Sequence, residues 1–510
     1  MASKFIRNSL FGIIAGFSTT FGNFISGLLV ARILGVELTG TVTFVIWLTN
    51  MLVTIFVAGI PPTLSRYLPE LSSSDTDKSV LSGVLSYMFR PFIGFALIPV
   101  TGLLIYSGWL AYSEIQTNTL NFNSNSLSNP IIYIIAAACC GLQAVADYVK
   151  AYYRGLQQFD QLARTIAVSV LFQMIVIAIG GTYYGVEGVL IGYLIGNGLP
   201  SIYIAQVIKG NRVVEPALKS RIFRYARFRW AAEVMSAFVW SRIEVFFLII
   251  WWGSGPVGLL TVGMSLANLA IQGPLMLTWG LLPRFTEQYG NNEIAGMNSA
   301  YQMATRLMAL LVFPACFGLA AIIPEILPLM FGQAFTPATT AAELLIFSAA
   351  IPAAATVGSN ILWATDRSDL DFYSAVAGAI IAIICGLTII PAFGLMGAAT
   401  ARVITQFAVV ALVSWFMAKK LKMSLPFRDL AKLGLAALLC AVAARTSLFV
   451  VQGILGIILA IFIGGITYAI GLRLFKAIPL GDAVKINAML NSFPAFIQRP
   501  VSFAVKLVTG

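Results

Sequence analysis

The sequence predicts an all-α polytopic membrane protein of about fourteen transmembrane helices. Of its 510 residues, 59% are hydrophobic and only 10% are charged, whereas a soluble domain is about half apolar and a quarter charged. Apolar stretches of roughly 20 residues, long enough to cross a bilayer, follow one another along the chain. Lys and Arg gather in the short segments between them. Lipid is therefore expected to be the main solvent of this chain.

The fourteen predicted helices are separated only by short polar segments. Their apolar stretches are centred in residues 9–34, 40–61, 80–106, 130–150, 163–181, 186–208, 228–251, 257–282, 300–322, 338–362, 370–391, 395–417, 429–449 and 454–474. The first stretch follows a short basic N-terminus, as a signal peptide does. It is too long for the apolar region of one, so we expect an uncleaved helix.

The placement of basic residues supports an even number of helices with both termini in the cytoplasm. Cytoplasmic loops of membrane proteins collect Lys and Arg. With the N-terminus inside, all 32 basic residues except Arg32, Arg242, Arg402 and Arg445 fall on the cytoplasmic side. The longest predicted outer loop, 107–129, contains Glu114 and no Lys or Arg. The net charge of +12 then reflects membrane topology in a cytoplasmic (inner) membrane, and no nucleic-acid partner is expected.

Two short patterns recur in order in the two halves of the chain. The first pattern is Gly35, Gly40 and Arg66, repeated as Gly253, Gly258 and Arg284, and in both copies the arginine follows the second glycine by 26 positions. The second is Tyr184-Gly185-Val186-Glu187-Gly188, repeated as Phe393-Gly394-Leu395-Met396-Gly397. Six helices per copy predict a parallel repeat, as in several transporters. The predicted regions are an N-lobe (1–210), a C-lobe (211–422), two extra helices (423–475) and a basic cytoplasmic tail (476–510).

The seventh predicted helix carries two charged residues near the middle of the bilayer. Trp230 lies near one end, and Trp251 and Trp252 lie at the other, as interfacial aromatic residues do. Arg242 and Glu244 fall between these ends. Ionisable residues inside a span are rare and mark functional sites by default.

On a continuous helix, one face of this segment would carry two carboxylates. Glu233, Trp240 and Glu244 are spaced by 7 and 4 residues and would share that face, whereas Arg242 would lie roughly opposite and need a different partner. We expect the face to line a substrate cavity. The alternative is a structural ion pair with a neighbouring helix.

Three further arginines are candidate cavity residues. Arg402 lies in the outer half of the twelfth predicted helix, with Gln406 one turn later. Arg66 and Arg284 occupy equivalent cytoplasmic ends of the two repeats, where a guanidinium matches the oxygens of a diphosphate. Ordinary positive-inside anchoring is the alternative for Arg66 and Arg284.

The sequence offers no sign of enzymatic or metal chemistry. It has no histidine, and its five cysteines lie in apolar stretches without metal-ligand spacing. It has no Walker A or HExxH motif. We therefore expect no enzyme activity and no cofactor, so transport would draw on protons, sodium, the membrane potential or consumption of the product.

Four segments resemble the polysaccharide transport branch, with its Wzx-type oligosaccharide flippases, of the MATE-like flippase superfamily. They are Asn8-Ser9-Leu10, Ala31-Arg32-Ile33-Leu34-Gly35 with Gly40, Arg66-Tyr67-Leu68-Pro69-Glu70 and Phe393-Gly394-Leu395-Met396-Gly397-Ala398-Ala399. With the helix number and repeat, the resemblance spans roughly residues 8–475. It implies two six-helix lobes in a V around a central cavity that opens alternately to each side.

The resemblance also implies a substrate. This is an oligosaccharide on a polyprenyl diphosphate, translocated for O-antigen, capsule or exopolysaccharide synthesis, with polysaccharide polymerase and chain-length proteins as possible partners besides the lipid bilayer. Multidrug efflux and flipping of a peptidoglycan precursor are alternatives on the same fold. An alternative of another class is a membrane-embedded polysaccharide polymerase or ligase. Such enzymes usually have a larger outer loop than this sequence offers.

Overall fold

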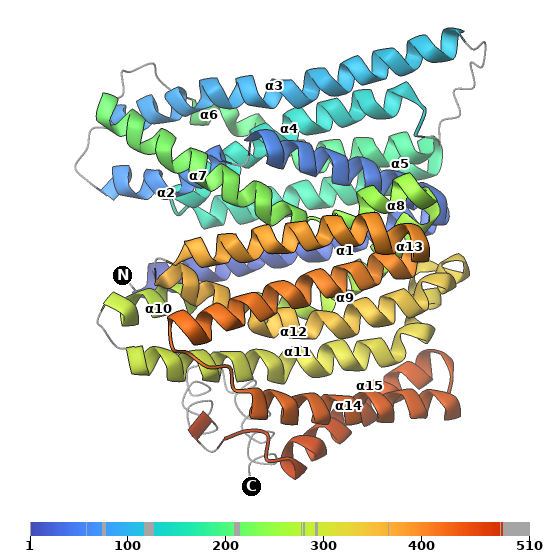
Figure 1. Cartoon of the computed structure of the whole chain (residues 1–510). Helices are drawn as coiled ribbons and strands as arrows, with labels where there is room; N and C mark the ends of the chain where they lie inside the picture. The colour runs from blue at the N-terminus through green and yellow to red at the C-terminus, as the bar shows by residue number, and fades with distance from the viewer. Residues whose placement is uncertain are drawn as a thin grey trace. The chain divides into compact units, whose positions relative to one another are not determined.

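The computed structural model describes residues 2–57, 59–73, 78–116, 127–208, 215–276, 278, 281–290, 294–365, 367–479 and 481–482. Every regular element in this part is helical. The α-helices are α1 (Ala2–Val57), α2 (Ile60–Ser73), α3 (Lys78–Gln116), α4 (Pro130–Gly155), α5 (Phe159–Gly198), α6 (Ile204–Val207), α7 (Pro216–Trp240), α8 (Glu244–Trp252), α9 (Ser254–Met276), α10 (Leu281–Gly290), α11 (Ile294–Phe331), α12 (Thr339–Ala364), α13 (Ser368–Lys420), α14 (Phe427–Val450) and α15 (Gly453–Leu474) (Figure 1).

The predicted number of spans is confirmed. Among the described residues, ten helices are long and apolar enough to cross a membrane, and the bent pair of α7 and α8 supplies an eleventh span. Three of the ten each contain two helices joined at a sharp glycine kink, at Gly35, Gly185 and Gly394. Counting both halves of each kinked helix gives fourteen spans, so the chain is a multi-pass membrane protein.

The backbone confirms the predicted repeat at two pairs of glycines. Gly35 has φ 76° and ψ −171°, and Gly253, its counterpart, has φ 80° and ψ −168°. Gly185 has φ 57° and ψ −130°, and Gly394 has φ 55° and ψ −125°. These positive φ values are strained for any residue with a Cβ. Each pair therefore marks an equivalent corner, where one span turns into the next.

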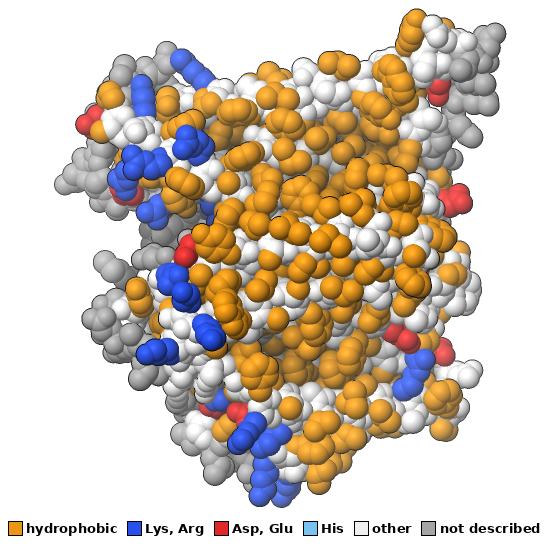
Figure 2. All heavy atoms as spheres, in the orientation of Figure 1, with side chains coloured by type: hydrophobic (Ala, Val, Ile, Leu, Met, Phe, Trp, Pro, Cys, Tyr) orange, Lys and Arg blue, Asp and Glu red, His pale blue; other side chains and the backbone are white. Residues whose placement is uncertain are grey.

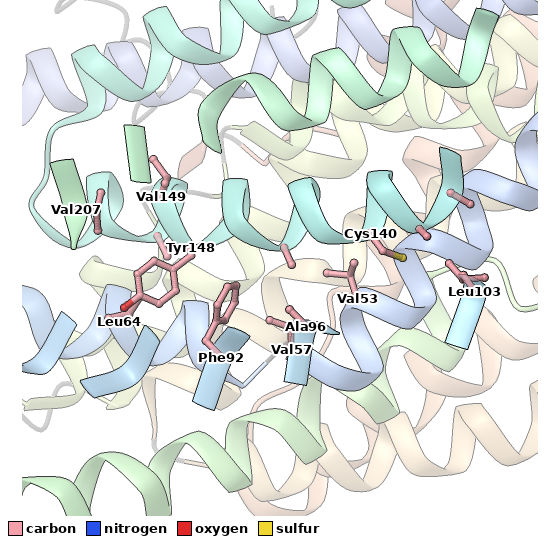
Figure 3. Close-up of a cluster of buried hydrophobic side chains, with 14 of the residues drawn as sticks. Val53, Val57, Leu64, Phe92, Ala96, Leu103, Cys140, Tyr148, Val149 and Val207 are labelled. Atoms are coloured by element: carbon pink, nitrogen blue, oxygen red, sulfur yellow. The ribbon is translucent and has the colours of Figure 1, made fainter. Parts of the chain in front are cut away.

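The chain divides into two compact units, of which the first comprises residues 1–261 and 382–398. In its core, α1, α2, α3 and α4 pack together (Figure 3). The Phe92 and Tyr148 rings have centroids 4.9 Å apart, and the buried Tyr148 hydroxyl donates to the Leu85 carbonyl at 2.6 Å. Because that hydroxyl is satisfied, the aromatic core of this unit carries no polar penalty at Tyr148.

The second unit comprises residues 262–381 and 399–510. Here α11 packs against both α12 and α14, and α14 pairs with α15. An ion pair between Arg445 of α14 and Glu343 of α12, at 3.2 Å, joins one of the two extra helices to this unit. In the same unit, Arg306 forms ion pairs with Asp429 and Asp482. The predicted tail at 476–510 lies outside the described residues from 483 onward.

Two details of the predicted helices are wrong. The third helix was expected to end near residue 106, but α3 continues to Gln116. The seventh was expected to run unbroken through 228–251, but α7 ends at Trp240, α8 begins at Glu244, and the two helices bend by 51°. Within each unit, the face seen in Figure 2 shows mainly hydrophobic side chains, and most of its Lys and Arg lie near one end of its helices.

Candidate functional site

The break between α7 and α8 is held by a tryptophan from α1. Arg242 lies in the break with φ 60°, a conformation that is uncommon for a residue with a side chain. Val245 N–H donates to the Arg242 carbonyl. In a continuous α-helix it would donate to the Ser241 carbonyl. The Trp47 indole N–H donates to the freed Ser241 carbonyl at 2.6 Å. The break is therefore a hydrogen-bonded structure that sets the direction of the side chains beside it.

The break separates the three residues that were expected to share one face. Glu233 forms an ion pair with Arg229, one turn away on α7, and 46% of Trp240 is exposed. Glu244 begins α8 and is only 3% exposed. Because α7 and α8 have different axes, the spacing of 7 and 4 residues no longer places these side chains together. The stripe of two carboxylates predicted for a continuous helix is not formed.

Different side chains lie near Arg242 and near Glu244. Arg242 is half-buried and lies within electrostatic range of the Tyr193 hydroxyl in α5. Glu244 lies within electrostatic range of the Cys385 thiol in α13. A carboxylate that is 3% exposed is costly in an apolar unit. Glu244 is therefore the most deeply placed ionisable group of the predicted site.

The remaining predicted site residues lie in other parts of the chain. Arg402 and Gln406 are half-buried in the part of α13 that belongs to the second unit. Arg66 is exposed at α2, with its guanidinium 5.2 Å from the centre of the Tyr225 ring and 5.9 Å from that of Tyr67. These are cation–π distances. The side chain of Arg284 lies outside the described residues.

A polar stripe on α4 is a site feature that our sequence analysis did not recognise. It consists of Gln143, Asp147, Lys150 and Arg154, at spacings of 4, 3 and 4, which place them on one helix face. Gln143 lies at the middle of the 26-residue helix, and its amide nitrogen donates to the Asn50 side-chain oxygen of α1 at 2.7 Å. This α4 polar stripe runs from the middle of an apolar helix to its basic end.

The α4 polar stripe combines both charges with hydrogen-bonding groups. Lys150 and Asp147 form the ion pair that their spacing predicts, at 3.1 Å, with side chains 21% and 36% exposed. Asn50 remains exposed while it accepts from Gln143. Partly exposed amides and charges of this kind can bind hydroxyl groups or phosphates.

The same groups do not suit a metal or a covalent step. No cluster of three or more potential metal ligands occurs within the described ranges. The five cysteines are buried free thiols, which is typical of packing residues rather than nucleophiles. The groups described around the α4 polar stripe and the α7–α8 break are amides, cations and carboxylates, which can bind polar ligands.

The class of protein follows from comparison with known families and structures. The family model described as "Polysaccharide biosynthesis protein" matches residues 5–288, more than half of the chain. The model described as "Lipid II flippase MurJ" matches residues 269–464. The chain belongs to the polysaccharide biosynthesis protein family. An uncharacterized membrane protein of Methanocaldococcus jannaschii is 21% identical over 405 residues, covering 74% of this chain and 89% of that protein.

Solved structures show the same fold. The lipid II flippase MurJ in an inward closed conformation aligns with a TM-score of 0.70 at 17% identity, covering 91% of this chain and 98% of that one. A multidrug resistance MATE family transporter of the MOP superfamily, in an inward-facing conformation, aligns with a TM-score of 0.64 at 13% identity, covering 79% and 94%. A MOP superfamily transporter from Pyrococcus furiosus gives 0.54 at 15% identity, covering 82% and 95%. The chain therefore has the MOP-superfamily transporter fold.

Proposed function

We propose that this protein flips an oligosaccharide linked to polyprenyl diphosphate across the cytoplasmic membrane, for the synthesis of a surface polysaccharide. The observation that carries the proposal is the α4 polar stripe, half-buried in a spanning helix of a chain from the polysaccharide biosynthesis protein family. A stripe of amides and paired charges is costly in hydrocarbon. It is useful where a hydrated sugar headgroup must pass.

The physical task is desolvation without covalent chemistry. A diphosphate and several sugars cannot enter hydrocarbon unaided, because each unpaired polar group costs several kcal/mol. Gln143 and Asn50 offer the hydrogen-bonding groups of amides to sugar hydroxyls, and Lys150 offers a cation to phosphate. Replacing water in this way lowers the barrier in both directions. Net export then needs an ion gradient, the membrane potential or consumption of the flipped product.

We propose alternating access as the mechanism, with the sequence-defined lobes 1–210 and 211–422 moving relative to each other. Arg242, Glu244, Arg402 and Gln406 are the proposed binding groups within the spans. Arg66 and Arg284 are proposed to receive the diphosphate at the cytoplasmic mouth, with both chain termini in the cytoplasm. In this proposal the protein performs no chemical reaction on its substrate, and polymerisation of the exported units falls to other proteins.

A peptidoglycan precursor is the second candidate substrate. The match of residues 269–464 to the lipid II flippase MurJ family favours it. Lipid II and oligosaccharide intermediates share the polyprenyl diphosphate and differ in the glycan. Drug efflux has support only from the fold of the MATE transporters. Both lipid-linked candidates are therefore preferred to a drug.

The deciding experiment combines a deletion with reconstitution. Deletion of the gene is expected to abolish one surface polysaccharide and to accumulate its lipid-linked intermediate inside the cell. Purified protein in vesicles is expected to flip a fluorescent polyprenyl-diphosphate oligosaccharide, measured by quenching with a membrane-impermeant reductant. Loss of cell-wall integrity instead of surface polysaccharide would assign the peptidoglycan precursor. Normal polysaccharide and normal cell wall in the deletion strain would refute both.

A further inference from the structure

A groove in the first unit lies apart from the α4 polar stripe and the α7–α8 break. It is formed where the end of α1 and the start of α2 meet α3 and α7, and it has a volume of about 390 Å³. This lies within the range of ligand sites, roughly 300–1,000 Å³. Gly59 permits the close packing of this region, because a Cβ there would lie 2.6 Å from the Ala226 carbonyl oxygen.

The groove is long and almost wholly apolar. Along α3 it extends from Tyr87 to Ile98, a distance of about 16 Å at the rise of an α-helix. Except for Tyr87, Arg227 and Trp230, its lining side chains are apolar. The Trp230 indole N–H is already used by the Ile55 carbonyl. The groove therefore has few groups with which to bind a sugar.

Its walls are open at the surface of the unit. Phe95 is 47% exposed, Ile98 46% and Phe223 58%. Large apolar side chains exposed on a membrane protein are more stable against lipid tails than against water. A chain already in the bilayer can thus enter from the side without crossing a polar barrier.

Two cations of α7 lie beside the groove, Arg227 in its lining and Lys219 next to the lining residue Tyr87. The Lys219 ammonium lies 5.2 Å from the centre of the Tyr87 ring, and the Arg227 guanidinium lies 5.9 Å from that of Phe223. Within the described part of α7 and its surroundings, neither cation forms an ion pair with a carboxylate. Their neighbours on α7 differ, since Arg221 pairs with Glu70 and Arg229 with Glu233.

We infer that this groove binds the polyprenyl chain of the lipid-linked substrate, with the diphosphate held between Lys219 and Arg227. The inference rests on the proposed function and adds the place where the lipid part of the substrate docks. A single elongated apolar groove with two cations beside it matches the phosphate-proximal part of one long hydrocarbon chain headed by phosphate. A phospholipid carries two acyl chains under its phosphate, and the second would remain outside the groove.

The test is photo-cross-linking in the full-length chain. A photoreactive phenylalanine replaces Ile98 in the groove, or Ile105, which is 72% exposed on the same helix and outside the groove. The protein is reconstituted in phosphatidylethanolamine–phosphatidylglycerol vesicles with radiolabelled polyprenyl-diphosphate N-acetylglucosamine. We expect label at position 98 and not at 105. Unlabelled polyprenyl diphosphate is expected to compete, and extra phosphatidylglycerol is not.

Charge variants test the two cations beside the groove, Lys219 and Arg227. Replacing both cations, K219Q with R227Q, is expected to lower the labelling at position 98 about tenfold, because charge-assisted contacts to phosphate are lost. R224Q removes an exposed cation of α7 that does not line the groove, and is expected to leave labelling unchanged. Equal labelling at 98 and 105, competition by phosphatidylglycerol, or indifference to K219Q/R227Q overturns the inference.

Flipping measured on the same vesicles separates this inference from the proposed function. An I98W variant fills the groove, and I105W is its matched control. If the wild type flips the substrate but position 98 is not labelled, the docking site is refuted and the function stands. If position 98 is labelled but the wild type does not flip, the proposed function is refuted and the lipid-binding groove stands.

Discussion

The first spans of the two repeats end alike but differ in the middle. Both end at a glycine of nearly the same conformation, Gly35 in α1 and Gly253 after α8. The span in α1 continues to Gly35 as helix, whereas the counterpart breaks between α7 and α8 and bends by 51°. With the offset of 218 residues, Glu244 in the second copy corresponds to Ser26 in the first copy. The two copies therefore share the glycine turn at the end of the first span and differ within that span.

The replaced position shows what the difference does. Ser26 is fully buried, and its hydroxyl accepts from the Gln173 side chain at 3.1 Å. Glu244 is buried to a similar degree but introduces a carboxylate. A neutral hydroxyl with a partner serves packing, whereas a buried carboxylate needs a functional or structural reason. The corners are thus the same in both copies, and the broken span of the second copy adds a buried carboxylate.

The fourth spans also differ, but here the first copy carries more charged residues than the second. In the first copy, α4 carries Asp147, Lys150 and Arg154 on its polar stripe. In the second, the only charged residue of α12 is Glu343, and it pairs with Arg445 of the extra helix α14. Duplication has therefore produced one scaffold with polar groups placed differently in each copy.

The largest expected effect concerns the corners that the copies share. A Cβ on Gly40 would overlap the Ser254 carbonyl, and one on Gly258 would overlap the Val36 carbonyl. These contacts are equivalent under the 218-residue offset. Gly40→Leu and Gly258→Leu should each destabilise the protein by about 3 kcal/mol or more, measured as the yield of folded protein and its unfolding in detergent.

Gly27→Ala is the matched control for the corner variants. Nothing lies within 4 Å of a Cβ at Gly27, and alanine favours a helix over glycine by up to about 1 kcal/mol. This variant should fold at least as well as the wild type. If Gly40→Leu failed and Gly258→Leu folded normally, the two corners would not be equivalent.

The second prediction addresses the first spans. Glu244→Gln keeps the size of the side chain and removes its charge, so folding should be retained while flipping falls at least about tenfold, or ~1.4 kcal/mol. Ser26→Ala at the equivalent position should leave flipping within about twofold of the wild type, since ~0.4 kcal/mol is within the scatter of a neutral change. Vesicle flipping rates at matched protein content provide the measurement. Equal rates for Glu244→Gln and the wild type would show that the carboxylate is structural.

The third prediction contrasts the two fourth spans. Lys150→Gln should lower flipping about fivefold by removing a half-buried cation from the α4 polar stripe, ~1 kcal/mol in the barrier. Glu343→Gln should leave flipping near the wild-type rate, because its partner Arg445 also donates to the Ala321 carbonyl at 3.0 Å. The flipping rate and the thermal midpoint are measured for both. A larger loss of transport in Glu343→Gln than in Lys150→Gln would reverse the proposed roles of the two spans.

The number and order of the spans could be predicted because they depend on a strong pattern, apolar stretches separated by basic segments. The break at Arg242 could not be predicted. An arginine carries no sequence signal for a positive φ, and the Ser241 carbonyl that the break frees is satisfied by Trp47, which is distant in sequence. The prediction that Glu233 and Glu244 share one helix face was wrong for that reason. The α4 polar stripe was present in the spacing of Gln143 to Arg154. It was missed because these four polar residues were not compared for a shared helix face.

The last prediction concerns the tryptophans at the breaks, where the effect is on folding rather than on transport. Trp47 donates to the Ser241 carbonyl freed by the α7–α8 break, and Trp252 donates to the Ile390 carbonyl one turn before the Gly394 kink. Trp47→Phe and Trp252→Phe keep an aromatic ring and remove the donor to a partly buried carbonyl, which costs about 1–3 kcal/mol each. Trp415→Phe, at a ring 52% exposed, should cost a few tenths of a kcal/mol at most. Denaturant titration in detergent gives the free energy of unfolding. If Trp47→Phe proved as neutral as Trp415→Phe, the break would be maintained by the chain around Arg242 itself, and the difference between the two first spans would not depend on α1.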